Sequence, residues 1–237
     1  YALKKDKKDW ILILDADEEI PKSLIKKLKK VMKDSKADYY RLPRKNIVFG
    51  KWMQHTKWWP DYNIRFFKSG SVSWNEVIHS VPMTTGKGAD LPNKEEYAII
   101  HHNYQSLEQY LNRMNRYTGI QANMLIDKNY KFIWKDLISK PINEFVDRYF
   151  AAKGYKDGLH GLALSLLQAF SEAMVYLKVW QEEKFLEQHI SLDEATNEFE
   201  QAGKDVKWWI TESHIRDKRT LSSFYLRLKR KLSRKNG

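Results

Sequence analysis

The chain has 237 residues, of which 42% are hydrophobic and 14% aromatic, so it can bury one sizeable core or two small ones. This composition excludes a chain that is disordered throughout. Because cysteine is absent, disulfides and thiolate metal sites are also excluded, and any cation must be held by carboxylates or histidines.

The formal net charge of +12 is concentrated near the C-terminus. Residues 216–235 contain nine Arg or Lys and one Asp, a net charge of +8, together with Leu221, Phe224, Tyr225, Leu226 and Leu228. A tail of this kind can bind an anionic membrane surface, and nucleic acid is the other polyanion to consider. A solvated, frayed terminus is the plain alternative. We expect the membrane rather than nucleic acid as partner.

The chain begins with Tyr1 rather than Met and shows no signal peptide. We therefore expect it to be a fragment of a longer protein.

The first predicted element is a strand over residues 10–14, a continuous apolar run followed by Asp15 and Asp17. Ligands of open α/β sheets bind at such strand ends. A strand this short needs neighbours, and we expect parallel ones upstream of the chain.

Residues 21–34 are predicted to form an amphipathic helix, with Pro21 in its first turn and apolar residues at spacings of three and four. The following residues, to about 102, have β character. Strands are predicted at 38–42, 63–67, 71–74 and 97–100, and residues 68–71 should form a hairpin turn between the second and the third.

After His102 the pattern is helical. Ser106 and Ser191 each open a capping box, Pro141 marks a helix boundary, and Gly154, Gly158 and Gly161 precede a long apolar helix over residues 159–180. On that helix we expect Leu162, Leu166, Phe170 and Met174 to pack into the core. Polar residues interrupt the helix, so we interpret it as buried or membrane-facing and not as transmembrane.

The predicted fold class is therefore α/β followed by helices. Residues 1–104 should form part of an α/β domain, residues 105–215 a helical region, and residues 216–237 a basic tail.

Asp15 and Asp17 are costly to bury unless something positive meets them. Mg²⁺ or Mn²⁺ fits, because these cations take one or two carboxylates and complete their coordination with water and substrate phosphate. Capping of the next helix by acidic residues is an equally simple explanation. Phosphatases of the haloacid dehalogenase type share an Asp-x-Asp after a strand. They fit poorly, because Glu18 replaces their usual Gly or Thr and no second acidic pair follows.

Four segments occur in a set order: Trp10-Ile-Leu-Ile-Leu-Asp-Ala-Asp-Glu18, Trp58-Trp-Pro-Asp-Tyr-Asn-Ile-Arg-Phe-Phe-Lys68, Val72-Ser-Trp74 with Ile78-His79, and Ile100-His-His-Asn-Tyr104. Together they resemble glycosyltransferase family 2, in particular the bacterial branch similar to lipopolysaccharide-core glucosyltransferases. The resemblance covers residues 9–180. It implies a GT-A fold, a nucleoside-diphosphate sugar as donor, inversion at the anomeric carbon, and a nucleotide-binding first half upstream of this chain. Where relatives often have His-Glu, this chain has His79-Ser80.

Candidate site residues follow from this resemblance and from the chemistry. An inverting transferase needs a carboxylate as base, for which we name Glu76 first and Asp61 second. Each is otherwise an ordinary surface carboxylate. His79 is a candidate third metal ligand beside Asp15 and Asp17, with a structural histidine as the alternative. His101 and His102 are reserve candidates, and alternation along their strand should bury one of them.

Along the chain, Arg65 lies within ten residues of three tryptophans: Trp58, Trp59 and Trp74. Trp59 and Trp74 are expected to line the acceptor side, and core packing is the alternative. Arg65, between apolar neighbours in a strand, needs a partner if buried, either the diphosphate or a structural carboxylate.

The leading hypothesis is transfer of a hexose from a nucleotide sugar to a cell-surface glycan or lipid-linked acceptor, as in lipopolysaccharide or polysaccharide biosynthesis. The enzyme would be cytoplasmic and peripheral at the inner face of the cytoplasmic membrane. The alternative is a non-catalytic basic module that binds membrane or nucleic acid through residues 216–235.

Overall fold

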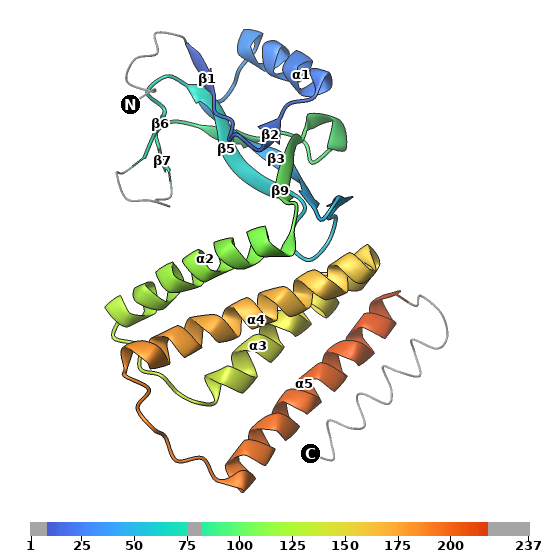
Figure 1. The fold of residues 1–237 in the computed structure, drawn as a ribbon. Helices are drawn as coiled ribbons and strands as arrows, with labels where there is room; N and C mark the ends of the chain where they lie inside the picture. The colour runs from blue at the N-terminus through green and yellow to red at the C-terminus, as the bar shows by residue number, and fades with distance from the viewer. Residues whose placement is uncertain (1–8, 75–81, 218–237) are drawn as a thin grey trace. The chain divides into compact units, whose positions relative to one another are not determined.

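The computed structural model describes residues 9–74 and 82–217. The chain divides into two compact units, residues 1–105 and residues 106–237, and each is described by itself (Figure 1). The first unit is a mixed α/β sheet and the second is helical, as the sequence predicts.

In residues 9–74 and 82–105, the first unit contains one α-helix, one 3-10 helix and strands of two to ten residues. In chain order these are β1 (Trp10–Leu12), β2 (Glu18–Glu19), α1 (Lys22–Lys33), β3 (Tyr39–Val48), β4 (Lys51–Trp52), β5 (Asp61–Lys68), β6 (Val72–Ser73), β7 (Met83–Thr84), β8 (Gly88–Asp90), η2 (Glu95–Tyr97) and β9 (Ile99–Tyr104).

Among the described residues the main sheet has the order β1-β5-β3-β9-β2, with β4 and β8 also paired to β3. β5 is antiparallel to both β1 and β3, whereas β9 runs parallel to β3 and antiparallel to β2. The long strands β3 and β5 form the centre, and the short β1 and β2 bring the two ends of the acidic segment 15–18 onto the sheet.

Apolar residues cover both faces of this sheet. On one face Leu24 and Leu28 of α1 pack against Tyr40, Leu42 and Phe66. On the other, a smaller cluster joins Ile11, Phe67 and Val72. Helix α1 forms as predicted, and its lysines lie on the outer side because Leu24 and Leu28 take the inner one.

The first strand pairs antiparallel with β5, with Ile11 and Leu12 opposite Phe67 and Phe66. The parallel neighbours expected upstream of the chain stay a prediction. One prediction for the sheet was wrong. The turn at residues 68–71 does form, with the Ser71 amide donating to the Lys68 carbonyl at 3.0 Å. However, β6 then pairs with β7 and not with β5, so the turn does not close a hairpin.

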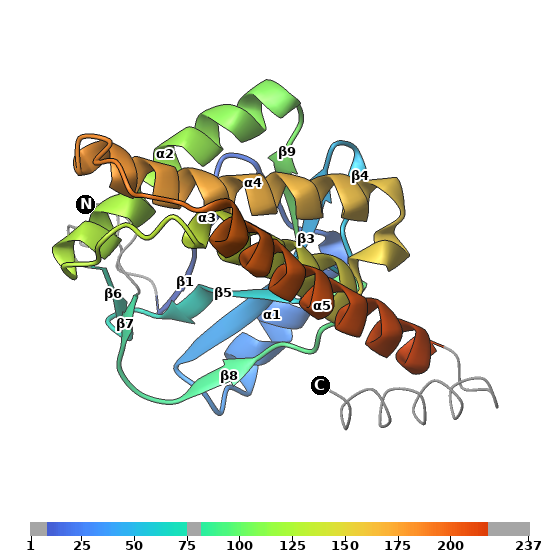
Figure 2. The same ribbon diagram turned by 90° about the horizontal axis from the view of Figure 1, so that it is seen from below.

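The second unit consists of α2 (Leu107–Asp127), α3 (Asp136–Val146), the π-helical turn η3 (Asp147–Ala151), the 3-10 turn η4 (Gly154–Asp157), α4 (Leu159–Glu182) and α5 (Leu192–Asp217). Helix α4 packs against both α2 and α3, and α5 packs against α3 (Figures 1 and 2). Ala122, Phe132, Val175, Tyr176 and Val179 form a core cluster in this unit.

Helix starts in this unit follow the predicted caps. The Gln109 amide donates to Ser106 Oγ at 3.2 Å, and Ser191 and Glu194 form the full reciprocal box. Pro141 does not end a helix, because α3 continues through it and stays packed on α4. Gly158, whose φ is +65°, interrupts the helical backbone just before α4, whereas Gly161 lies inside α4.

The prediction that Leu166 and Phe170 are core residues was wrong, since both are exposed. Their side of α4 points away from α2 and α3, because the buried side is formed by Gly161, Leu164, Ser165, Val175 and Val179. By length and composition alone α4 is long and apolar enough to cross a membrane, although only 33% of its most apolar 18-residue window is buried.

Candidate functional site

The segment from Asp15 to Glu18 forms a tight turn between β1 and β2. The Glu18 amide donates to the Asp15 carbonyl at 3.0 Å, and the Asp15 amide donates to Glu18 Oε2, also at 3.0 Å. The turn is tied to the sheet at both ends: Ile13 donates to the Arg65 carbonyl, and Glu18 pairs with His101 across β2 and β9. The backbone of the Asp15-Ala-Asp17 segment is therefore fixed by strand register and by one buried side chain.

That side chain is Glu18, which is fully shielded from solvent. Its Oε1 accepts from Arg65 Nη2 at 2.9 Å and from Arg44 Nη1 at 3.3 Å. Because a buried carboxylate is costly unless paired, these two guanidinium groups are what allow Glu18 to lie inside the sheet.

Arg65 also pairs with Asp15, so it links the buried Glu18 to the more exposed aspartate of the turn. Burial lowers the pKa of Arg65, but the hydrogen bonds that it donates to Asp15 and the charge of Glu18 outweigh this effect and raise that pKa overall. Arg65 is thus a fixed cation. The sequence left its partner open between diphosphate and carboxylate, and the structure places two carboxylates there.

Asp61 lies at the start of β5 and is held by β3. Arg44 donates to Asp61 Oδ2 through Nε at 2.9 Å and Nη2 at 2.6 Å, and Asn46 Nδ2 donates to the same oxygen at 3.0 Å. Asn63 Nδ2 donates to Oδ1 at 3.1 Å. The Asp61 carboxylate is therefore oriented by its neighbours and remains partly exposed.

Of the two neighbouring histidines, His101 is buried and His102 is exposed, as strand alternation predicts. His101 Nδ1 is 2.7 Å from Asn46 Oδ1, and its Nε2 is 3.6 Å from Asp17 Oδ2. Burial and the charge of Arg44 lower the pKa of His101, and the carboxylates of Asp17, Glu18 and Asp61 only partly counter this. A neutral His101 can therefore stand beside Asp17 without supplying a charge.

The cluster carries more negative than positive charge. Four carboxylates, those of Asp15, Asp17, Glu18 and Asp61, surround two guanidinium groups, those of Arg44 and Arg65. With His101 neutral, an excess of two negative charges remains at the turn.

Asp15 and Asp17 are the carboxylates of this negatively charged cluster that solvent reaches most easily. Their oxygen atoms suit Mg²⁺ or Mn²⁺. Within residues 9–74 and 82–217, no three His, Asp or Glu side chains lie together as a ready cage. The residues therefore fit a cation that takes one or two carboxylates and completes its coordination with water or phosphate.

The aromatic residues are arranged in pairs. Trp59 makes an edge contact with Trp52 at 5.2 Å, Trp58 does so with Tyr104 at 6.3 Å, and Trp74 lies 5.7 Å from Phe67. Trp74 is exposed, while the buried indole Nε1 atoms of Trp52 and Trp58 have no hydrogen-bond partner. Glu76 and His79 lie outside the described residues, so their predicted roles as base and metal ligand stay predictions.

Three residues that complete the cluster were not named as site residues from the sequence: Glu18, Arg44 and Asn46. Arg44 and Asn46 are two residues apart on β3 and therefore share a face. An Arg and an Asn that follow the buried Leu42 on the same face of a central strand indicate that polar partners must lie opposite.

Comparison with known proteins supports a common origin for this region. Residues 1–86 match the family described as Glycosyl transferase family 2, a segment that holds all the cluster residues except His101. Among curated relatives, an uncharacterized glycosyltransferase of Rickettsia bellii is 26% identical over 73% of this chain and 62% of its own length. Relatives described in the same words from Rickettsia typhi and Rickettsia felis are 25% and 24% identical, each over 72% of this chain and over 62% and 64% of their own lengths.

The chain thus spans about three fifths of the length of these relatives. No solved structure matches. The mixed sheet followed by helices is consistent with a GT-A domain continued by a helical region. The family match over residues 1–86 and the relatives described as glycosyltransferases together support a glycosyltransferase of family 2.

Proposed function

We propose that this protein takes part in the transfer of a hexose from a nucleoside-diphosphate sugar to a glycan or lipid-linked acceptor, with inversion at the anomeric carbon. The observation that carries the proposal is the turn at Asp15–Glu18, where four carboxylates meet two guanidinium groups within the family segment. Such an excess of negative charge suits a divalent cation that brings a diphosphate with it.

In this proposal Asp15 and Asp17 hold Mg²⁺ or Mn²⁺, which when bound neutralises the diphosphate leaving group. Arg65 and Glu18 have a different task. They fix the turn, because Arg65 pairs with Asp15 while Glu18 accepts from the Asp15 amide. Arg65 Nε is buried without a hydrogen-bond partner, which leaves this guanidinium with one unused donor.

The reaction needs a carboxylate that takes the proton of the acceptor hydroxyl as its oxygen attacks the anomeric carbon. The bond between that carbon and the phosphate oxygen breaks, and the nucleoside diphosphate leaves with the electron pair. Glu76 remains the first candidate for the base. For Asp61, the three donors from Arg44 and Asn46 orient the carboxylate but compete for its lone pairs, which favours a role in positioning.

Trp59 and Trp74 are proposed to line the acceptor side, since aromatic faces pack against sugar rings. The exposure of Trp74 beside Phe67 suits that role. The acceptor would belong to lipopolysaccharide or another cell-surface polysaccharide, made at the cytoplasmic face of the membrane. The basic residues 218–237 would add attraction to anionic lipid.

A thermal-shift panel tests the donor site directly. Because the nucleotide-binding half is expected upstream, unfolding is followed for the protein at the full length of its relatives, with UDP-, GDP- and dTDP-hexoses, each with and without Mn²⁺. One donor should raise the unfolding temperature only when Mn²⁺ is present, because a ligand of the native state adds stability by mass action. Asp17→Asn should abolish this shift, whereas Glu19→Gln, an exposed neighbour, should retain it.

Retention of the full Mn²⁺-dependent shift in Asp17→Asn would refute the assignment of the metal to this turn. If no donor shifts the unfolding temperature of the full-length protein under any condition, the proposal that it binds a nucleoside-diphosphate sugar is wrong.

A further inference from the structure

From Leu159 to Leu177, one side of helix α4 has no polar residue. At 100° per residue, Leu159, Ala163, Leu166, Phe170, Ala173 and Leu177 fall within about 100° of arc. Exposed fractions on this side are 78% for Leu159, 54% for Leu166 and 50% for Phe170. We call these six residues the outer face of α4.

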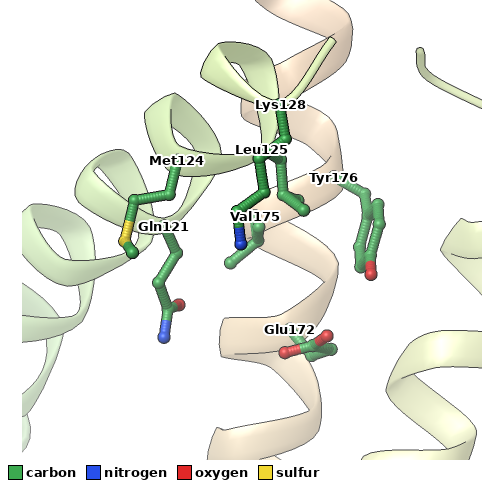
Figure 3. A pocket seen from close by; sticks show the side chains of 7 residues that line it. All are labelled: Gln121, Met124, Leu125, Lys128, Glu172, Val175 and Tyr176. Carbon is green, nitrogen blue, oxygen red and sulfur yellow. The ribbon is translucent and has the colours of Figure 1, made fainter. Parts of the chain in front are cut away.

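The opposite side of α4 carries its polar groups and faces the other helices. Gln168 Nε2 donates to Tyr110 Oη of α2 at 2.7 Å, and Lys178 Nζ donates to Asn115 Oδ1 at 2.8 Å. Glu172 reaches a hollow of about 260 Å³ between α4 and α2, where Figure 3 shows it with Gln121, Lys128 and Tyr176. Apolar residues also pack on this inner side, among them Leu164, Val175 and Val179. Helix α4 thus differs from a helix on the surface of a water-soluble protein in that its outer side is apolar as well.

An exposed apolar side of a helix has a cost in water. Scattered single apolar residues are normal on a surface, but a contiguous apolar strip along a helix marks a contact surface. From Leu159 to Leu177 the strip is about 27 Å long at 1.5 Å per residue. A surface of that length without charge needs an apolar partner.

We propose that the outer face of α4 docks on the surface of a lipid bilayer, with the helix lying in the plane of the interface and its aliphatic side chains among the upper acyl carbons. Charge complementarity selects this partner. Residues 218–237, which follow α5 in the same unit, contain eight Arg or Lys and no Asp or Glu. Anionic headgroups attract such a segment, and the apolar face then supplies the second contact.

The inner side of α4 excludes a spanning arrangement for α4 alone. Gln168 and Lys178 are bonded to α2, so α4 enters hydrocarbon only by breaking those bonds or by taking α2 with it. Helix α2 carries the exposed Arg116 on its surface, which is expensive within hydrocarbon. Docking in the plane keeps these bonds and this charge in the polar layer. The inference is independent of the transfer reaction.

The absence of cysteine makes a direct experiment simple, because one introduced cysteine is the sole labelling site. Full chains with Leu166→Cys or Phe170→Cys are labelled with the polarity-sensitive fluorophore NBD and mixed with vesicles of phosphatidylcholine and phosphatidylglycerol in a 7:3 ratio. Both labels should shift to the blue, gain intensity about two-fold or more, and be quenched by shallow doxyl lipids. The matched control is Met32→Cys on α1, which is 47% exposed and should not respond.

Water-like NBD emission at 166 and 170 on sedimented vesicles would overturn the inference, as would failure of the chain to bind these vesicles. A blue shift without lipid that grows with protein concentration would assign the outer face to a second copy instead. As a second measurement, Leu166→Glu with Phe170→Glu should weaken vesicle binding at least about ten-fold. Met32→Glu should leave it unchanged, and equal binding by all three proteins would contradict the proposal.

Discussion

The two units both bury an apolar core, but they differ in how many large apolar side chains they expose. Among the described residues, four large apolar side chains are exposed in the first unit and thirteen in the second. The first unit keeps its apolar residues under α1 and in the sheet, and gathers charge at one turn. The second turns a whole apolar side of α4 outward and keeps Gln168, Glu172 and Lys178 between its helices. Amphipathic spacing therefore identifies an apolar side of a helix, but the environment decides which way that side points.

Buried charge differs in the same way. Glu18 in the first unit is paired with Arg44 and Arg65, so its burial is compensated. Glu172 in the second lies near Glu144, whose charge adds to the effect of burial, while Lys140 and Arg148 compensate only in part. The first arrangement should stabilise its unit, and the second should cost it stability.

Of the substitutions that test this comparison, the removal of the Glu18 carboxylate should lower the stability of its unit most. Glu18→Ala leaves Arg44 and Arg65 without their buried carboxylate, and breaking one side of such a pair costs about 3–5 kcal/mol. Hydrogen exchange measured by mass spectrometry should show faster exchange in residues 9–74 and little change in residues 106–217. The neighbouring Glu19→Ala, on an exposed side chain, should change stability by no more than about 0.5 kcal/mol. Equal losses in the two variants would mean that the pairing of Glu18 contributes nothing.

Two leucines of α4 report on its two sides, Leu164 on the inner side and Leu166 on the outer side. Leu164 is fully buried, so Leu164→Ala should cost about 2–5 kcal/mol in denaturant unfolding. Leu166, two residues further on, is exposed, and Leu166→Ala should change stability by about 0.5 kcal/mol or less without lipid. A loss at Leu166 as large as that at Leu164 would show that the outer face is packed against protein in solution.

Replacement of two glycines by alanine should change stability in opposite directions. A Cβ at Gly161 would lie 1.9 Å from the backbone oxygen of Gly154, so Gly161→Ala should destabilise by about 1–3 kcal/mol. At Gly119 in α2 the nearest atom is the flexible Lys178 Nζ at 3.7 Å, and Gly119→Ala should stabilise by about 0.5–1 kcal/mol. Thermal unfolding of both variants checks this. A neutral Gly161→Ala would mean that α4 and η4 separate easily.

The sequence predicted those elements whose signals are local. The periodicity of α1 and the caps at Ser106 and Ser191 depend on residues within one or two turns, and both predictions were confirmed. Strand partners depend on distant residues. The antiparallel pairing of β1 with β5 and of β6 with β7 was therefore missed, as was the length of β3, which continues through Pro43.

The candidate site shows the same division. Asp15 and Asp17 were visible because they end an apolar run, and the need of Arg65 for a partner followed from its neighbours. The roles of Glu18, Arg44 and Asn46 arise from register between β2, β3, β5 and β9, which no local pattern encodes. The outward direction of Leu166 and Phe170 was missed because a helical pattern carries no information on what lies beyond the surface.

Glu172 offers the smallest effect and the one that depends on pH. Burial and the charge of Glu144 raise its pKa above 4.5 in the folded chain, with Lys140 and Arg148 opposing. The folded state then binds a proton more tightly than the unfolded state, so stability falls as the pH rises from about 4.5 through the folded pKa. Glu172→Gln removes this loss. It should raise the unfolding temperature at pH 7.5 by roughly 1–3 °C and leave it unchanged near pH 4.

The exposed Glu182→Gln at the end of the same helix is the control, and it should show no such dependence on pH. A Glu172→Gln variant that is less stable than the parent at pH 7.5 would mean that the charge of Glu172 is fully compensated by Lys140 and Arg148. The contrast with Glu18 would then disappear, because both units would bury their carboxylates in stabilising pairs. Only the exposed apolar side of α4 would then distinguish the second unit from the first.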